Sequence, residues 1–109
     1  MGEGKDDIVY PYNGNSNEAR VWISASTINK CIAAGGSTAM IALLSTIFGN
    51  LAGPVQGLIG IIVGYGITVI AQKVGSNNGA VMIVGLNQVA SFGVSSWFGY
   101  DPVWDIQMQ

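Results

Sequence analysis

Two long stretches without a charged residue, 31–72 and 74–100, dominate this chain, and only Lys73 separates them. Each is long enough to hold a helix that crosses a lipid bilayer, which takes about 20 mainly apolar residues. Only 9% of the 109 residues are charged, against about 25% in a typical soluble domain. The sequence therefore predicts one domain at most, in contact with a membrane or with other subunits of a polymer.

The composition also excludes several classes of protein. Its apolar content excludes disorder, the absence of a glycine at every third position excludes collagen, and its acidic balance argues against a nucleic-acid surface. With no His and one Cys, the chain has no disulfide pair, no zinc site and no Ser/His or Cys/His pair for catalysis. We therefore expect no enzyme, no metal and no cofactor, and we expect Cys31 to be a small buried apolar residue.

Most of the charge lies near the N-terminus. Seven of the ten charged residues fall within 1–30, and the polar run 13–17 (NGNSN) is typical of a loop. We expect 1–21 to form an exposed polar arm and 100–109 to form a C-terminal tail. The early acidic residues are not followed by an apolar run, so this region does not have the pattern of a secretory signal.

Local start and stop signals predict helices between the arm and the tail. Ser24 or Ser26 can cap a helix that stops at the Gly pair at 35–36. A second helix then runs to Gly49, although the two can equally be one helix over 24–49 that bends at the glycine pair. A Gly-Pro pair at 53–54 starts the next helix, 54–73, whose uncharged part spans about 28 Å. A polar turn at 73–78 leads to a further apolar helix over 79–98.

The predicted fold class is therefore all-α, in a helical domain over 22–99. It consists of an apolar helical hairpin preceded by a shorter N-terminal helix, either kinked or in two pieces. An alternative for 80–94 is a β structure, because the run AVMIV is rich in β-branched residues and LNQ is typical of a turn. We favour the helix because Asn87, Ser91 and Ser95 recur at four-residue spacing and form one polar stripe. A membrane would also leave the edges of an isolated hairpin unpaired.

Glycines recur every three or four residues along the first apolar helix and more sparsely along the second. Each can weaken a helix in water by up to about 1 kcal/mol, and close contact with another helix is the usual compensation. That contact can lie within the hairpin, or between identical subunits, which the large number of glycines favours. The predicted packing residues are Gly49, Gly53, Gly57, Gly60, Gly64, Gly85 and Gly93.

Lys73 is the residue whose position most invites a functional role. A lysine at the end of an apolar helix can simply interact with the helix C-terminus and mark the cytoplasmic side of a membrane. No carboxylate interrupts either apolar stretch, so a proton-carrying role at mid-membrane is not expected.

The stretch from about 44 to 99 resembles the conjugative pilins of type IV secretion systems. The shared pattern is a Gly-Pro pair that opens a glycine-dotted apolar helix, a short turn with a basic residue, and a second apolar helix that ends in Phe-Gly. The resemblance implies a subunit held in the inner membrane and then assembled, with phospholipid, into a hollow helical filament at the cell surface. It implies identical subunits, phospholipid, the secretion machinery and transferred single-stranded DNA or protein as partners, and it places Lys73 at the lumen or at lipid headgroups.

A structural subunit of such a pilus is thus the leading functional hypothesis. The alternative is a secreted pore-forming, bacteriocin-like protein, because a glycine-rich apolar hairpin can also insert into a target bilayer. Its net charge of −2 argues against binding to anionic membranes. A third class, a resident membrane protein such as a phage lysis hairpin, normally carries a charged cytoplasmic tail that this sequence lacks.

Overall fold

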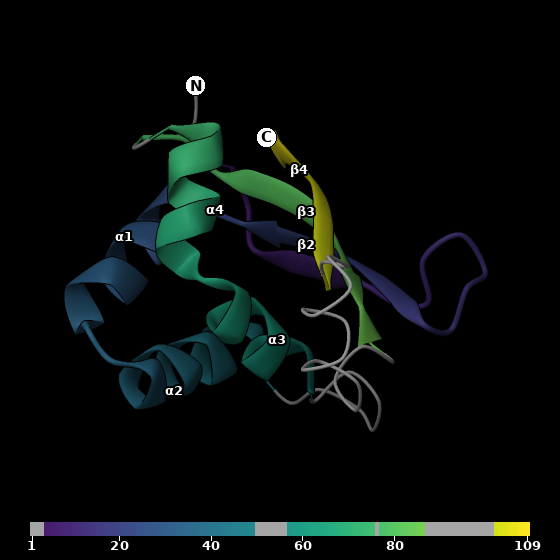
Figure 1. Ribbon diagram of the computed structural model, residues 1–109, viewed down its shortest axis with the longest axis horizontal. Coiled ribbons are helices and arrows are strands. Elements are labelled where there is room, and N and C mark those ends of the chain that lie inside the picture. The colour runs from purple at the N-terminus through teal and green to yellow at the C-terminus, as the bar shows by residue number, and fades with distance from the viewer. Residues whose placement is uncertain (1–3, 50–56, 76, 87–101) are drawn as a thin grey trace.

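The computed structural model of the chain describes residues 4–49, 57–75, 77–86 and 102–109. These residues form two layers, a four-stranded antiparallel sheet and a group of helices packed against one of its faces (Figure 1). The strands lie side by side in the order β1-β2-β3-β4. Their bounds are Asp7–Val9 for β1, Glu18–Ile23 for β2, Ala80–Gly85 for β3 and Val103–Met108 for β4.

The described helices all lie between β2 and β3 in the sequence. They are α1 (Ala25–Ala34), α2 (Ser37–Phe48), α3 (Leu58–Tyr65) and α4 (Ile67–Val74). Helices α3 and α4 contact β3 and β4, whereas α2 packs against α1 and α3. The core lies between the two layers, where the inward side chains of β2 and β3 meet the apolar faces of the helices.

In strand β2, buried and half-buried side chains alternate along the chain. Ala19, Val21 and Ile23 are fully buried against the helices, while the residues between them are half-buried on the outer face. Strand β3 pairs with β2 along its whole length, from Ala80 opposite Ile23 to Gly85 opposite Glu18. All six residues of β3 are buried, in keeping with its place between β2 and β4 in the sheet.

The predicted all-α fold class is wrong, and the second arm of the hairpin shows why. The range 79–98 was expected to be a helix, but Ala80–Gly85 is β3, as the alternative for 80–94 proposed for this part. The β-branched residues there gain backbone partners on β2 and β4, so the edges that make an isolated hairpin unfavourable are satisfied. The polar stripe of Asn87, Ser91 and Ser95 lies outside the described residues.

The prediction for the first arm of the hairpin is wrong as well. Instead of one helix over 54–73, the structure has α3 and α4, which are separated by Gly66 at a φ of 120°. Because the chain bends there, apolar residues of both helices, such as Ile62 and Ile70, become fully buried. Among the described residues, no helix combines the length and the hydropathy that a bilayer crossing requires.

The sheet also contains parts of the chain that were expected to be an arm and a tail. Strand β1 and the start of β2 lie within 1–21, and β4 lies within 100–109. Over 24–49, where the sequence left open one bent helix or two pieces, the structure has two helices. Ser24 caps α1 through a hydrogen bond that its side chain accepts from the Thr27 N–H, Gly35 ends the helix, and Gly49 ends α2.

Candidate functional site

Charge is divided unequally between the two layers. The four helices contain two charged residues, Lys30 and Lys73, and no acidic residue. The acidic residues that the structure describes lie in strands or beside them, at Asp6, Asp7, Glu18 and Asp105. The helical layer is therefore weakly basic, although the whole chain has a net charge of −2.

The helical layer also has a broad uncharged surface at the junction of its first two helices. Eight consecutive residues, 32–39, are exposed, and the exposed residues of α2 continue this surface to Thr46. We call the exposed residues of 32–46 the α1–α2 surface. It includes Ile32 at 42% exposure and Ile41 at 40%. Only Leu44 of α2 is buried, even though the helix is strongly apolar.

The structure separates the glycines that were predicted to form one packing face. Gly60 and Gly64 are the exposed residues of α3, and the exposed Gly57 directly precedes the helix. A Cβ added at Gly60 or Gly64 would meet no other residue within 4 Å. Gly49 instead ends α2, and Gly85 is the buried last residue of β3. The two remaining predicted packing residues, Gly53 and Gly93, lie outside the described residues.

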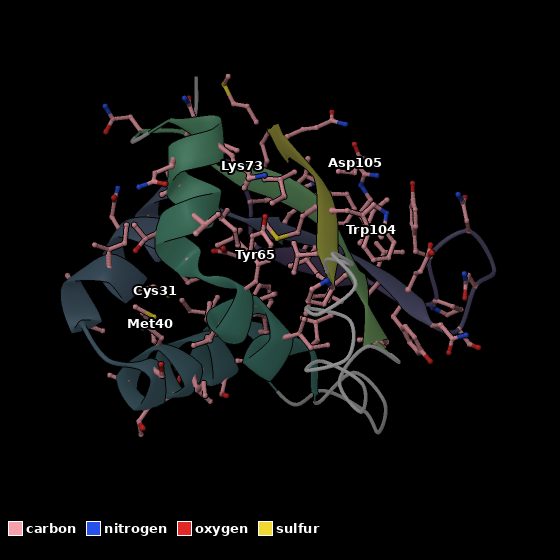
Figure 2. All side chains as sticks on the ribbon, in the orientation of Figure 1. Cys31, Met40, Tyr65, Lys73, Trp104 and Asp105 are labelled. Atoms are coloured by element: carbon pink, nitrogen blue, oxygen red, sulfur yellow. The ribbon has the colours of Figure 1, made fainter. Side chains whose placement is uncertain are left out.

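Lys73 lies in the last turn of α4 and its side chain is exposed (Figure 2). A cation at this position interacts favourably with the partial negative charge of the helix C-terminus. The position of Lys73 at the end of a helix is therefore explained by local structure alone. Because the side chain is exposed, its ammonium group is also available to an anionic surface.

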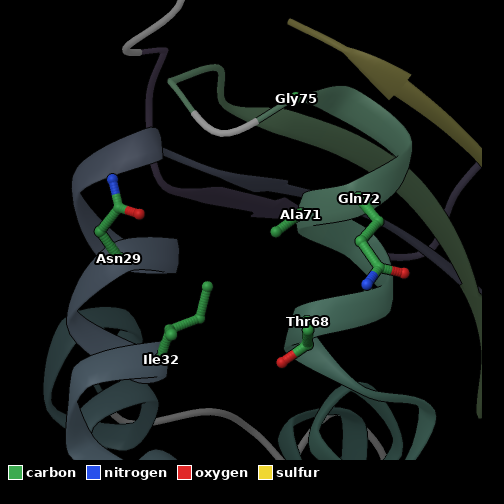
Figure 3. Close-up of a pocket in the computed structure, with 6 residues that line it drawn as sticks. All are labelled: Asn29, Ile32, Thr68, Ala71, Gln72 and Gly75. Atoms are coloured by element: carbon green, nitrogen blue, oxygen red, sulfur yellow. The ribbon is translucent and has the colours of Figure 1, made fainter.

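A shallow cavity of about 310 Å³ lies between α1 and α4. Asn29 and Ile32 of α1 face Thr68, Ala71 and Gln72 of α4 across it, and Gly75 closes one end (Figure 3). The lining combines two carboxamides and a hydroxyl with apolar side chains and has no charged group. It offers hydrogen bonds to a neutral ligand, and it holds no group suited to acid–base or nucleophilic chemistry.

The outer face of the sheet carries cations beside aromatic rings, which the sequence analysis missed. The Lys5 Nζ lies 4.5 Å from the centre of the Trp22 ring. Arg20 donates a hydrogen bond of 3.1 Å to the Tyr12 hydroxyl and lies 3.7 Å from a carboxylate oxygen of Asp105. The period-two pattern of β2 was the signal that could have found this face. Because the Arg20 side chain is only 19% exposed, we assign the cluster a structural role.

Cys31 is fully buried, as expected. Burial raises the pKa of its thiol, and the negative charge of Asp6 raises that pKa further. The thiol is therefore protonated and a poor nucleophile at neutral pH. Figure 2 shows it in the helical layer. No group of three or more potential metal ligands occurs among the residues that the structure describes.

Comparisons with known proteins give no relative from which a role could be transferred. No protein-family model matches this chain, no curated protein matches its sequence, and no solved structure matches its fold.

Proposed function

We propose that this protein is a membrane-active protein of the pore-forming, bacteriocin-like kind, which meets the bilayer through its helical layer. The observation that carries the proposal is the distribution of charge. Apart from Asp6, whose carboxylate contacts the start of α1, the described acidic residues lie in the strands, and the helices carry only Lys30 and Lys73. The net acidity of the chain is thus no obstacle to anionic lipids at the helical layer.

Two physical contributions favour this orientation. Each lysine close to an anionic membrane surface contributes about 1 kcal/mol to binding. The α1–α2 surface adds exposed apolar area without any charged group that would have to lose its water, and apolar burial contributes roughly 25 cal/mol per Å². The opposite orientation would bring Asp7 and Glu18 towards the headgroups.

Dye release from lipid vesicles tests the proposal. We expect the purified protein to release a trapped dye from vesicles that contain an anionic lipid, and to release less from neutral vesicles. Raising the salt concentration should reduce the difference, because salt screens exposed charges. If the protein neither binds to these vesicles nor releases dye from them, the proposed function is wrong.

A filament subunit with bound phospholipid, the function that the pilin resemblance implies, is a second candidate. The hairpin on which the resemblance depends is absent from the described residues, but one observation favours assembly. The exposed residues of α3 are Gly60 and Gly64, and nothing in the described part of the chain uses the close approach that these two glycines allow. A neighbouring subunit would use it.

Substitutions of exposed glycines at α3 can distinguish an effect on assembly from an effect on folding. Because the space around Gly60 is open, we expect Gly60→Leu to fold as the wild-type chain does. If the exposed side of α3 packs closely against another subunit, Gly60→Leu and Gly57→Leu should abolish filaments, which electron microscopy would detect. Filaments that persist in both variants would show that α3 is not the subunit contact. A wild-type protein that forms none would remove the second candidate.

A further inference from the structure

A carboxylate from the N-terminal segment is hydrogen-bonded to the start of the helical layer. Asp6 directly precedes β1, and its two carboxylate oxygens accept three hydrogen bonds from the beginning of α1. The donors are the Ser24 N–H at 2.8 Å, the Ser24 hydroxyl at 3.1 Å and the Thr27 hydroxyl at 2.9 Å. Ser24 and Thr27 are only 4% and 3% exposed, so few water molecules reach these hydroxyls while the helix is in place.

Helix α1 has no acidic residue in its own first turn. Asp6 therefore supplies, from 18 residues upstream, the negative charge that a helix N-terminus favours. The segment that carries Asp6 is itself fixed to the sheet. The side-chain amide of Gln109 accepts a hydrogen bond from the Lys5 N–H and donates to the carbonyls of Lys5, Ile23 and Ala80.

We propose that Asp6 is a latch that holds the first turn of α1 in place beside the end of β2, and that its release lets α1 and α2 leave α3 and α4 and enter a lipid bilayer. The inference rests on the proposed membrane function. When the latch opens, the hydroxyls of Ser24 and Thr27 lose the Asp6 carboxylate as a partner, and the first turn of α1, which directly follows β2, is less firmly held. Beyond Lys30, the freed segment through Gly49 carries no charge that would oppose its transfer into lipid.

Asp6→Ala and its neighbour Asp7→Ala form a matched pair. Both substitutions remove one carboxylate from the same segment. The Asp7 carboxylate, however, contacts only that segment among the described residues, through the Ile8 N–H at 2.9 Å and the Lys5 ammonium at 3.6 Å. We expect Asp6→Ala to speed amide hydrogen exchange in α1 by about tenfold or more, with the exchange of β2 and β3 nearly unchanged. Asp7→Ala should leave exchange in α1 as it is.

The same variants are then compared for dye release from anionic vesicles. Asp6→Ala should release dye several times faster than the wild-type protein, Asp7→Ala should match the wild type, and Thr27→Val, which removes one of the three hydrogen bonds, should fall between them. Val84→Ala, a core substitution in β3, controls for general loss of stability and should not reproduce faster exchange confined to α1.

The two measurements also distinguish failure of the latch from failure of the proposed function. The latch is overturned if exchange in α1 is unchanged, if it rises equally in the helices and the sheet, or if a wild-type protein that releases dye is not surpassed by Asp6→Ala. If the wild-type protein releases no dye at all, the proposed function fails and the membrane step of this inference fails with it. Faster exchange confined to α1 would then still show that Asp6 holds the helix closed.

Discussion

Ile41→Glu should reduce the rate of dye release from anionic vesicles by about tenfold or more, because a carboxylate on the α1–α2 surface must lose water to enter lipid. Ile41 is 40% exposed in the centre of α2, so the substitution leaves no cavity. Glutamate also has a slightly better helix propensity than isoleucine. We therefore expect the free energy of unfolding, measured with urea, to change little while the membrane activity falls.

Val9→Glu is the matched control for this prediction. Val9 is 42% exposed, almost as much as Ile41, and the substitution adds the same negative charge, but to β1 at the edge of the sheet. If the helical layer faces the bilayer, Val9→Glu should release dye at nearly the wild-type rate. Equal losses in the two variants would mean that net charge alone governs binding, and a loss confined to Val9→Glu would place the sheet at the membrane.

Local signals in the sequence predict the helical structure over 24–49, but they do not predict the sheet. A serine before α1 and glycines after α1 and α2 act through neighbouring backbone groups, so the sequence around Ser24, Gly35 and Gly49 contains the information needed. The strand Ala80–Gly85 becomes favourable only because Glu18–Ile23, distant in the sequence, supplies its hydrogen-bond partners. The low charge content favoured a prediction of membrane helices. The alternation of polar and apolar residues in β2 was therefore not recognised as a strand.

The candidate membrane surface was predictable only in part. The absence of charge over 31–72 is visible in the sequence, and so is the isolated position of Lys73. The exposure of the α1–α2 surface depends instead on how α2 packs against α1 and α3. The contact between Asp6 and Ser24 joins residues that no local motif connects. Of the predicted packing glycines, the structure brings Gly57, Gly60 and Gly64 together because they recur on one side of a helix.

Substitutions of two glycines by alanine should change stability in opposite directions. Gly60 lies inside α3 with open space around it, so Gly60→Ala should raise the free energy of unfolding by about 0.5–1 kcal/mol through better helix propensity. Gly66, between α3 and α4, has a φ of 120°, and a Cβ there would lie 3.2 Å from a methyl carbon of Val69. Gly66→Ala should therefore lower the free energy of unfolding by roughly 1–3 kcal/mol.

The sign of the change in the free energy of unfolding in Gly66→Ala distinguishes the bent arrangement from the straight helix that the sequence predicts over 54–73. In a continuous helix both glycines would occupy interior helical positions, and alanine would stabilise both. In the bent structure only Gly60 has helical backbone angles that alanine adopts without strain. Urea unfolding followed by circular dichroism measures both effects, with Gly64→Ala as a second exposed position expected to behave like Gly60→Ala. Stabilisation by Gly66→Ala would contradict the bend. A loss of stability there, beside a gain at Gly60, would show that α3 and α4 reach the core only because the chain turns between them.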